Sequence, residues 1–456
     1  MGMTALFFMV PAYGHLNLTF KLARQLQSDG YQIVYGYLGK PELAQQIHRQ
    51  GFAVHWLQSL PFGIGVEEAT HKEKSESYLE SLLDRFTDKT FRARSADLQR
   101  TVEALKPALI FVDSYYSTDF IVLYPFIKDK GIEVILLQTM LSTYEDAATP
   151  PLNSQRIPGQ DSVGAIRRAW RTYYRNRAFK QLGQTLLYLG RSNHRIIRQK
   201  FRQNGLPDDH RIRRDKTFYT GFDNLPEWIL YPRAFEFPQR TLHPFQQHLG
   251  LMIDAERVEN PSSSYQTMLK QLSQERQTNP EVKVMYASLG TVSNAHAKPR
   301  LLKGFYQRLI AAAARQPNWR LILSVGPELK AVLPDRIPNG WIFERVPQVD
   351  MLRHCDAFVT HGGPNSVLEG VLCGVPMLAY PLNDTWDQNG YTARLAYFGC
   401  GLTGNLRKDR PGDMEQKMIQ LLTEPKFRQK LLAFREQLQD FDGSTALFAL
   451  FGEKKS

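Results

Sequence analysis

Short apolar runs alternate with amphipathic helical stretches along the chain, and this pattern occurs twice. The first series begins at Leu6–Val10 and reaches Glu133–Gln138; the second begins at Val282–Ser288 and includes Ala357–Thr360. Short runs that are apolar throughout are typical of parallel strands buried on both faces. Alternation of strand and helix predicts such a sheet with helices on either side. The expected class is therefore α/β, with two Rossmann-like, doubly wound domains facing across a cleft.

The domain boundary is expected in a polar segment between the two series. We predict an N-terminal domain at residues 1–250, a linker at 251–280, a second domain at 281–435, and a tail at 436–456 that packs back on the first domain. Residues 221–250 contain four prolines and are expected to be irregular. A chain of 456 residues is long enough for two hydrophobic cores.

The bulk composition is that of an ordinary globular protein, with 43% hydrophobic and 22% charged residues. No apolar run approaches the ~20 residues that span a bilayer, and Leu6–Val10 is expected to be a first strand and not a signal peptide. The three cysteines are too few for a disulfide framework and have no metal-ligand spacing. A cytoplasmic location is therefore expected.

Positive charge is concentrated between Arg156 and Lys216. This block has sixteen Lys and Arg residues against four Asp, a difference equal to the +12 of the whole chain. Its arginines lie in helical stretches with apolar residues between them, which is typical of a solvated helix face. Peripheral contact with an anionic membrane surface is the alternative. No nucleic-acid partner is expected.

A glycine-rich turn follows the predicted strand Ala357–Thr360 and leads into a helix. The turn contains His361 and Gly363, and the helix begins near Asn365 and Ser366. In an open parallel sheet, ligands bind outside the carboxyl ends of the strands. A helix N-terminus offers free N–H groups and a partial positive charge to a phosphate. These features predict a nucleotide-type anion site, although a plain strand–helix turn would have similar glycines.

His15 follows the first predicted strand, and Asp113 ends the strand Ala108–Val112. Both residues should therefore lie at the carboxyl edge of the first sheet. A histidine can take a proton from a hydroxyl near neutral pH. A neighbouring carboxylate would fix the tautomer of the imidazole and stabilise its protonated form. Asp113 could instead cap the helix that follows it.

Three motifs resemble those of family 1 glycosyltransferases of the GT-B type, which glycosylate small molecules from UDP-sugars. They are PAYGHLN near the N-terminus, VPQVDML at 346–352, and HGGPNSVLEGVLCGVPM from His361 with the downstream Asp387-Gln388. Their order and spacing match that family, and the resemblance covers essentially the whole chain. Within that family, the chain resembles bacterial macrolide, flavonoid and zeaxanthin glycosyltransferases.

The resemblance implies a role for each matching position. His15 matches the catalytic base and Asp113 its partner. The implied donor contacts are to the diphosphate, the ribose, the uracil and the sugar. They come from Gly14, Thr291, Arg345, Val346, Gln348, His361, Gly363, Asn365, Ser366, Glu369, Asp387 and Gln388. Glu369 matches the acid that binds the ribose, and Asp387 with Gln388 matches the pair that holds the sugar.

The chain departs from the family pattern at several donor positions. Arg345 stands where many members have a tryptophan that stacks on uracil, and a guanidinium can also stack on a base. Pro364 removes one backbone N–H from the phosphate turn. Two extra residues separate Pro381 from Asp387, so Asp384 and Trp386 compete for the sugar. The choice between UDP and dTDP also stays open.

The reaction implied is a single displacement that inverts the anomeric carbon and moves a hexose, expected to be glucose, to a hydroxyl of a small apolar acceptor. The acceptor would be of the polyphenol, macrolide or carotenoid type, held by Leu60–Ile64, Tyr115-Tyr116 and Leu141–Tyr144. No cofactor or metal is expected, since the Asp440-Phe441-Asp442 motif follows the last helix. The alternatives are a lipid-linked sugar transferase at the membrane surface and a sugar-nucleotide epimerase of the same fold.

Overall fold

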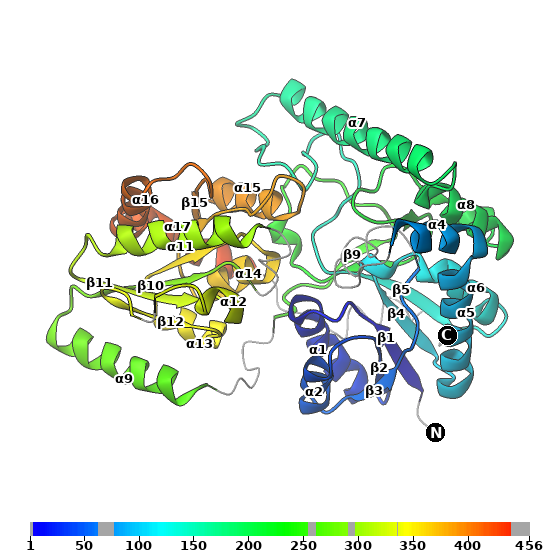
Figure 1. Ribbon diagram of the computed structural model, residues 1–456, viewed down its shortest axis with the longest axis horizontal. Coiled ribbons are helices and arrows are strands. Elements are labelled where there is room, and N and C mark those ends of the chain that lie inside the picture. Colours follow the sequence, from blue (N-terminus) through cyan, green and yellow to red (C-terminus); the bar gives the residue numbers. More distant parts are fainter. Residues whose placement is uncertain (1–2, 63–76, 254–260, 291–296, 335, 439–456) are drawn as a thin grey trace. The chain divides into compact units, whose positions relative to one another are not determined.

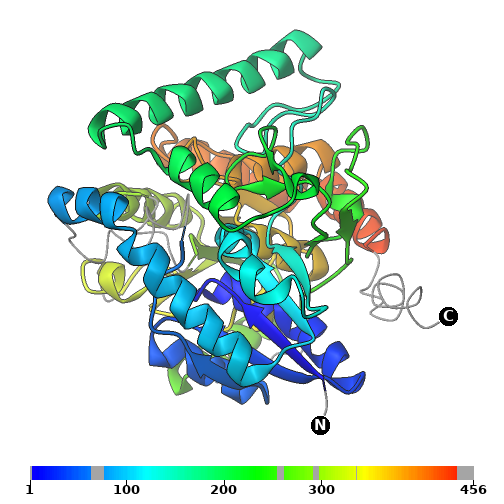
Figure 2. The same ribbon diagram turned by 90° about the vertical axis from the view of Figure 1, so that its right-hand side faces the viewer.

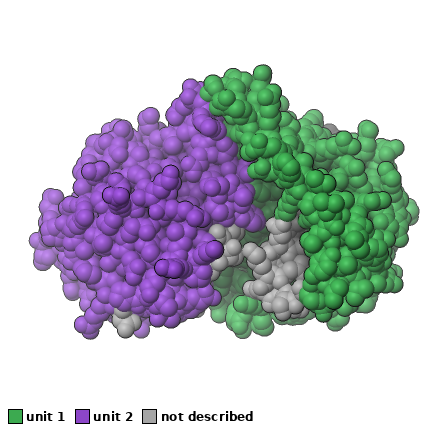
Figure 3. Space-filling model, turned by 45° about the horizontal axis from the view of Figure 1, so that its top comes forward, with its two compact units in different colours: residues 1–151, 162–254, 439–456 green, residues 152–161, 255–438 purple. Residues whose placement is uncertain are grey.

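The computed structural model describes residues 3–62, 77–253, 261–290, 297–334 and 336–438. Its contacts divide the chain into two compact units, which Figure 3 colours separately. Unit 1 contains the described residues up to 151 and from 162 to 253; unit 2 contains 152–161 and the described residues from 261 onward. The segment 152–161 thus interrupts unit 1 in sequence but packs with unit 2. The predicted tail lies outside the described residues beyond position 438.

Unit 1 is built on a parallel sheet of seven strands in the order β3-β2-β1-β4-β5-β8-β9. The strands are β1 (Thr4–Phe8), β2 (Gln32–Tyr37), β3 (Ala53–Trp56), β4 (Leu109–Asp113), β5 (Glu133–Gln138), β8 (Glu227–Ile229) and β9 (Gln246–His248). A small antiparallel pair, β6 (Ile212–Arg213) with β7 (Gly221–Phe222), accompanies the sheet.

Helices of unit 1 flank this sheet, whereas α7 (Val163–Leu187) runs apart from it (Figure 1). The other helices of this unit are α1 (Tyr13–Ser28), α2 (Pro41–Arg49), α4 (Tyr78–Thr87), α5 (Lys89–Leu105), α6 (Asp119–Ile127) and α8 (Asn193–Gln203), with short 3₁₀ turns η1 (Ser114–Tyr116), η2 (Asp208–His210) and η3 (Arg233–Phe235). Successive side chains of a strand face opposite ways. Leu6 and Phe8 accordingly join a core with α5 and α6, whereas Phe7 stacks between Tyr35 and Phe111 on the other face.

Unit 2 repeats the plan with six parallel strands in the order β12-β11-β10-β13-β14-β15. The strands are β10 (Lys283–Ser288), β11 (Trp319–Ser324), β12 (Gly340–Phe343), β13 (Ala357–Thr360), β14 (Met377–Ala379) and β15 (Gly401–Thr403). The helices are α9 (Ser263–Thr278), α11 (Pro299–Ala313), α12 (Pro327–Lys330), α13 (Gln348–Leu352), α14 (Pro364–Leu372), α15 (Gln388–Phe398), α16 (Pro411–Thr423) and α17 (Pro425–Glu436).

The strand order reverses at one place in each sheet. In unit 1 it reverses between β1 and β4, which pair with Phe8 opposite Val112. In unit 2 it reverses between β10 and β13, which pair with Ser288 opposite Thr360. Ligands of doubly wound proteins bind at this switch point, beyond the carboxyl ends of the two strands. The segments that begin after Phe8, Val112, Ser288 and Thr360 are therefore the places to look for a site.

The predicted two-sheet α/β class is confirmed, but one local prediction was wrong. Residues 221–250, expected to be irregular, contain β8 and β9, which extend the first sheet because β8 pairs in parallel with β5 and β9 with β8. The linker region contains the 16-residue helix α9, capped by the Ser262 side chain. Among the described residues, the structure has no helix that is long and apolar enough to cross a membrane.

Candidate active site

His15 and Asp113 meet at the switch point of unit 1. His15 is in the first turn of α1, beside Gly14, and Asp113 is the last residue of β4. The imidazole Nδ1 lies 2.6 Å from Asp113 Oδ2. Asp113 is fully buried, whereas the His15 side chain keeps 15% of its surface exposed. A buried carboxylate thus orients a histidine that a ligand can still reach.

The hydrogen bonds of Asp113 fix which ring nitrogen of His15 is basic. Asp113 Oδ1 accepts from the Tyr115 N–H at 3.0 Å, and Oδ2 accepts from the Val10 N–H at 3.3 Å. Since an ionised carboxylate can only accept, the proton of a neutral His15 must be on Nδ1. Nε2 is then left with its lone pair, as a general base requires. The bond to Tyr115 also means that Asp113 caps η1, so the two roles considered for this residue coexist.

Thr139 and Tyr115 complete the surroundings of His15. Thr139 Oγ1, just past the end of β5, lies 3.1 Å from His15 Nδ1. The Tyr115 ring meets the imidazole edge-on at 4.5 Å and packs against Tyr219. Sequence reasoning missed Thr139, because a threonine after a strand has no chemical signature; its position past a third strand end was the available signal.

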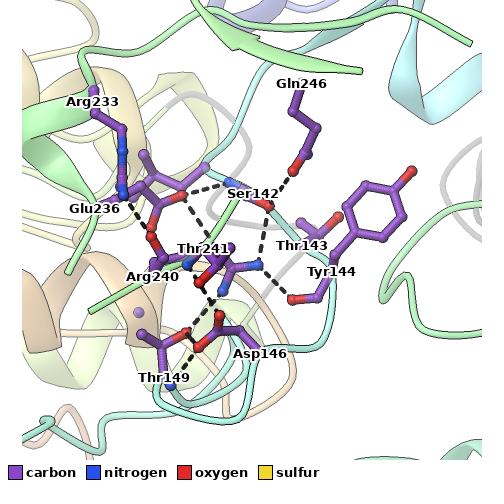
Figure 4. A network of polar contacts seen from close by, with 12 residues as sticks. Ser142, Thr143, Tyr144, Asp146, Thr149, Arg233, Glu236, Arg240, Thr241 and Gln246 are labelled. Carbon is purple, nitrogen blue, oxygen red and sulfur yellow. Dashed lines mark hydrogen bonds and ion pairs between the residues drawn. The ribbon is translucent and has the colours of Figure 1, made fainter. Parts of the chain in front are cut away.

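The loop that carries Thr139 is held by a buried polar network (Figure 4). Arg240 donates to Ser142 Oγ and Thr149 Oγ1, each at 3.0 Å, and to the Tyr144 carbonyl. Glu236 Oε1 accepts from the Ser142 N–H at 2.8 Å. These hydrogen-bond acceptors of the Arg240 guanidinium are on the loop after β5, and Glu236, which binds the same loop, lies 3.8 Å from Arg240 Nε. The network fixes this loop, and with it the hydroxyl beside His15.

Two of the expected acceptor segments look different in the structure. Leu141–Tyr144 is at most 2% exposed and packs into the polar network, so it does not line an open surface. Phe62 is nearly buried, with its N–H bonded to Asp119 and its carbonyl to Thr118, and Gly63 and Ile64 lie outside the described residues. Tyr115 is the partly exposed aromatic side chain that touches His15.

In unit 2, three glycines shape the switch point around His361. Gly362 has φ +79°, a left-handed conformation that favours glycine, and a Cβ there would lie 2.6 Å from Thr392 Oγ1. A Cβ on Gly363 would collide with His361 Nε2, and one on Gly290 would lie 2.7 Å from His361 Cε1. The imidazole therefore lies directly against the backbone of both Gly290 and Gly363. Helix α14 begins immediately after Gly363, with Pro364 at its first position.

Gln348 connects the predicted phosphate and ribose residues of unit 2. Its Nε2 donates to Ser366 Oγ at 3.0 Å and to Glu369 Oε2 at 2.6 Å, and its Oε1 accepts from the Tyr286 hydroxyl at 3.3 Å. Burial raises the pKa of Tyr286, so this hydroxyl stays protonated and can donate. Glu369 is 4% exposed. The structure thus brings together residues from α13 and α14 that are far apart in sequence.

The remaining residues predicted to bind the donor differ in how exposed they are. Val346 is buried, Arg345 is exposed, and Asn365 is in the first turn of α14. Thr291 lies outside the described residues. Gly290, which sequence reasoning passed over in favour of Thr291, is the residue of that turn seen to contact His361.

The loop before α15 contains the two residues that are additional to the family pattern, and Asn383 holds this loop together by hydrogen bonds. Asn383 Oδ1 accepts from the N–H groups of Thr385 and Trp386, and its carbonyl accepts from Asn389 Nδ2 at 2.8 Å. Gln388 is 4% exposed, and its Oε1 accepts from the Leu382 N–H at 2.8 Å. The Gln388 side chain therefore supports the loop. Asp387 is 8% exposed, whereas Asp384 is exposed and Trp386 half-buried.

A segment from the middle of the chain packs against this loop. Gln155 Nε2 donates to Asn389 Oδ1 at 2.9 Å. Leu152 covers Gly390 so closely that a Cβ at Gly390 would collide with the Leu152 carbonyl. The 152–161 segment of unit 2 therefore supports α15 at its N-terminal end, next to Asp387 and Gln388. Sequence reasoning did not identify it, because a short polar loop gives no sign of its packing partner.

Comparison with known proteins bears on the nature of the two sites. Residues 228–440 match a family model described as UDP-glucoronosyl and UDP-glucosyl transferase. Over 451 residues the chain is 23% identical to the 4'-demethylrebeccamycin synthase of Lentzea aerocolonigenes, covering 96% of each protein. Over 99 residues it is 40% identical to the NDP-glycosyltransferase YjiC of Bacillus licheniformis, a segment that spans only 22% of this chain and 23% of that relative.

A solved structure extends the likeness over the whole chain. The glycotransferase of kitacinnamycin is 19% identical, with a TM-score of 0.69, and the match covers 99% of this chain and 98% of that one. At this identity the match shows the fold, which is GT-B. The predicted resemblance is confirmed, and the matches support a transferase enzyme. Residues 228–440 thus match the model of UDP-glucoronosyl and UDP-glucosyl transferases, within a chain that has the GT-B fold.

Proposed function

We propose that the protein transfers a hexose, with glucose as the expected sugar, from a UDP-sugar to a hydroxyl of a small, largely apolar acceptor. The acceptor would be of the polyphenol, macrolide or carotenoid type, and the reaction would take place in the cytoplasm with inversion at the anomeric carbon. The observation that carries the proposal is the 2.6 Å contact between His15 Nδ1 and the buried Asp113. This contact leaves His15 Nε2 as a base at the switch point of unit 1.

The proton transfer follows from the hydrogen bonds of this pair. As the acceptor oxygen attacks the anomeric carbon, its proton passes to His15 Nε2. The new C–O bond forms while the bond from the same carbon to the diphosphate breaks, and UDP leaves with the electron pair. Asp113 stabilises the imidazolium that forms, because its Oδ2 accepts from Nδ1 throughout. Tyr115, packed on the imidazole, is the expected aromatic contact for the acceptor.

The donor half of the proposal is supported by the features around α14. A diphosphate leaving group gains negative charge in the transition state and needs preorganised donors. The N-terminus of α14 and the His361 ring beside Gly290 and Gly363 are suitable donors. The Glu369 carboxylate suits the ribose hydroxyls and is held in place by Gln348. No metal or other cofactor is required in this scheme.

The test is a matrix of donors and acceptors scored by nucleotide release and by product mass. UDP-glucose, UDP-galactose, UDP-GlcNAc and dTDP-glucose are each offered with a flavonoid, a macrolide aglycone and a carotenoid diol. Release of UDP together with a glycoside mass supports transfer. If only the dTDP-sugar works, the assignment of UDP is wrong.

His15→Ala separates transfer from the epimerase alternative. Loss of general-base catalysis typically costs about 10²–10⁴-fold in rate, so transfer by His15→Ala should fall by at least the lower value. His48→Ala is the matched control, since His48 is an exposed residue in the last turn of α2. A His15→Ala protein with full turnover, or one that interconverts UDP-sugars without an acceptor, would favour the epimerase.

A further inference from the structure

Helices α4 and α7 of unit 1 expose an unusual number of large apolar side chains. On α7, Phe179, Leu182 and Leu186 are 65%, 55% and 72% exposed, and on α4, Leu79 and Leu83 are 65% and 61% exposed. Each set is spaced by three or four residues, so each forms a stripe on one helix face. The buried residues of the 25-residue α7 are confined to its first eight positions. The second half of this helix therefore turns an apolar stripe to solvent.

The two stripes belong to one surface, which we call the α4–α7 face. The Tyr78 hydroxyl donates to the Leu187 carbonyl at 2.6 Å, and the Tyr78 and Tyr188 rings stack at 6.0 Å. The Arg191 guanidinium lies 4.6 Å above the Phe86 ring. These contacts join α4 to the end of α7, and Figures 1 and 2 show the two helices adjacent there. Phe86, Leu187 and Leu189 add to the exposed apolar residues at the junction.

The helices of this face carry positive charges and no negative ones between Val163 and Gln203. From Val163 through Gln203 the sequence has eleven Lys and Arg residues and no Asp or Glu. Arg168, Arg171 and Arg175 precede Phe179 by one to three helical turns on the same outward side of α7. Within the described part of the chain, none of these three arginines pairs with an acidic residue. The apolar stripe therefore continues into a stripe of unpaired positive charge.

Several arginines also lie close enough to His194 to add to the effect of burial on its pKa. Burial, followed by the charges of Arg198, Arg177 and Arg214, lowers the pKa of His194 to about 4. Positive charge is thus concentrated over α7 and α8, where Lys200 of α8 pairs with Asp88.

The combination of charge and exposed apolar side chains selects one kind of partner. Scattered exposed leucines are normal, but a contiguous apolar patch marks an interaction site. A second copy of the same face would bring two sets of cations together, which would oppose association. An anionic phospholipid surface offers phosphates to the arginines and an acyl boundary to Phe179, Leu182 and Leu186.

We propose that the α4–α7 face docks the protein on membranes that contain anionic phospholipid. The apolar stripe enters the headgroup boundary, and Arg168, Arg171 and Arg175 lie over the phosphates. This inference does not depend on the transfer reaction, since it rests on a surface away from His15. If the reaction is also as proposed, docking would hold the enzyme at the membrane, where an apolar acceptor would accumulate.

The test is co-sedimentation of the full-length protein with vesicles of phosphatidylglycerol and phosphatidylcholine, compared with phosphatidylcholine alone. One variant combines Phe179→Gln, Leu182→Gln and Leu186→Gln; the other combines Arg168→Gln, Arg171→Gln and Arg175→Gln. Each surface cation contributes about fivefold to binding of an anionic membrane, so the arginine variant should bind about 100-fold more weakly. The apolar variant should lose at least tenfold, and high salt should weaken the wild type.

Matched controls are available on unit 2. Lys270→Gln, Arg300→Gln and Arg428→Gln remove three exposed cations and should leave vesicle binding within about threefold, since their charges are not on the face. All variants should keep the wild-type unfolding midpoint, because the replaced side chains are exposed. Equal binding to both vesicle types, no binding at all, or loss of binding in the control variant would overturn the proposal. A dimer in sedimentation velocity that the apolar variant abolishes would make the face a self-interface instead.

Discussion

Replacing Asp113 with Asn tests the link between the hydrogen bonds of unit 1 and its chemistry. Asp113 accepts from His15 Nδ1 at 2.6 Å and also from two backbone N–H groups, of Val10 and Tyr115. An Asn side chain has one oxygen for the backbone groups and would turn its NH₂ toward His15. Nδ1 must then accept, so the proton moves to Nε2 and the basic lone pair is lost.

The expected rate loss is large because the tautomer itself changes. In comparable histidine–aspartate pairs this substitution costs about 10⁴-fold in kcat. His15 Nδ1 has one more polar neighbour here, the Thr139 hydroxyl at 3.1 Å. We therefore expect kcat to fall by about 10³–10⁴-fold, which corresponds to about 4 to 5.5 kcal/mol of transition-state stabilisation. The change in KM should be small, since Asp113 is fully buried and touches no substrate. Loss of its charge should also lower the free energy of unfolding by about 1–3 kcal/mol.

Two measurements check this prediction. Steady-state kinetics with the best donor and acceptor give kcat and KM, and long-range ¹H–¹⁵N NMR of His15 reports which nitrogen carries the proton. The wild type should be protonated on Nδ1 and Asp113→Asn on Nε2. Thr139→Val is the control, since it removes a neighbour of Nδ1 without a change of tautomer, and should cost less than about tenfold. A folded Asp113→Asn protein within tenfold of wild-type kcat would refute the reasoning.

Three further predictions concern the donor side and stability. Gly363→Ala should weaken UDP binding about tenfold in titration calorimetry, because the methyl group displaces the His361 ring; unchanged affinity would contradict the contact. Gln155→Ala removes a donor to Asn389 and should change the ratio of KM values for UDP-glucose and UDP-galactose; an unchanged ratio would assign the contact to stability alone. The depressed pKa of His194 predicts an unfolding free energy that is fully retained above about pH 6.5 and falls as the pH drops toward about 4. His194→Asn should flatten this dependence in urea denaturation at several pH values.

The fold could be predicted where the sequence carries a long-range pattern. Buried strands such as β1 and β4 are apolar except for Thr4 and Asp113 at their ends, so their parallel pairing and the two-sheet plan followed from alternation alone. Strands β8 and β9 have three residues each and lie among prolines. Their extended shape depends on the pairing of β8 with β5 and of β9 with β8, which is a tertiary effect that no local signal reports.

Periodicity also identified apolar helix faces without saying what covers them. Leu79, Leu83 and Phe86 have the spacing of a core-facing stripe, and in the structure they are exposed. Helix α4 ends just before Asp88, whose φ of 54° separates it from α5. Hydrophobic spacing is thus a property of one helix, whereas burial depends on its neighbours.

The residues of the site also divide into those that the sequence predicted and those that it did not. His15, Asp113 and His361 were found because strand ends of parallel sheets gather at one edge, and the structure brings the first two into contact. Thr139 and Gln155 were missed, since a hydroxyl or an amide in a loop matters only through a partner that is distant in sequence. Arg240 was missed for the same reason.

A single displacement with His15 as the base requires inversion at the anomeric carbon. The most direct measurement is the ¹H NMR spectrum of the glycoside made from α-linked UDP-glucose, read at the anomeric proton. A β-glycoside is the expected product. An α-glycoside would contradict attack by an acceptor that His15 deprotonates.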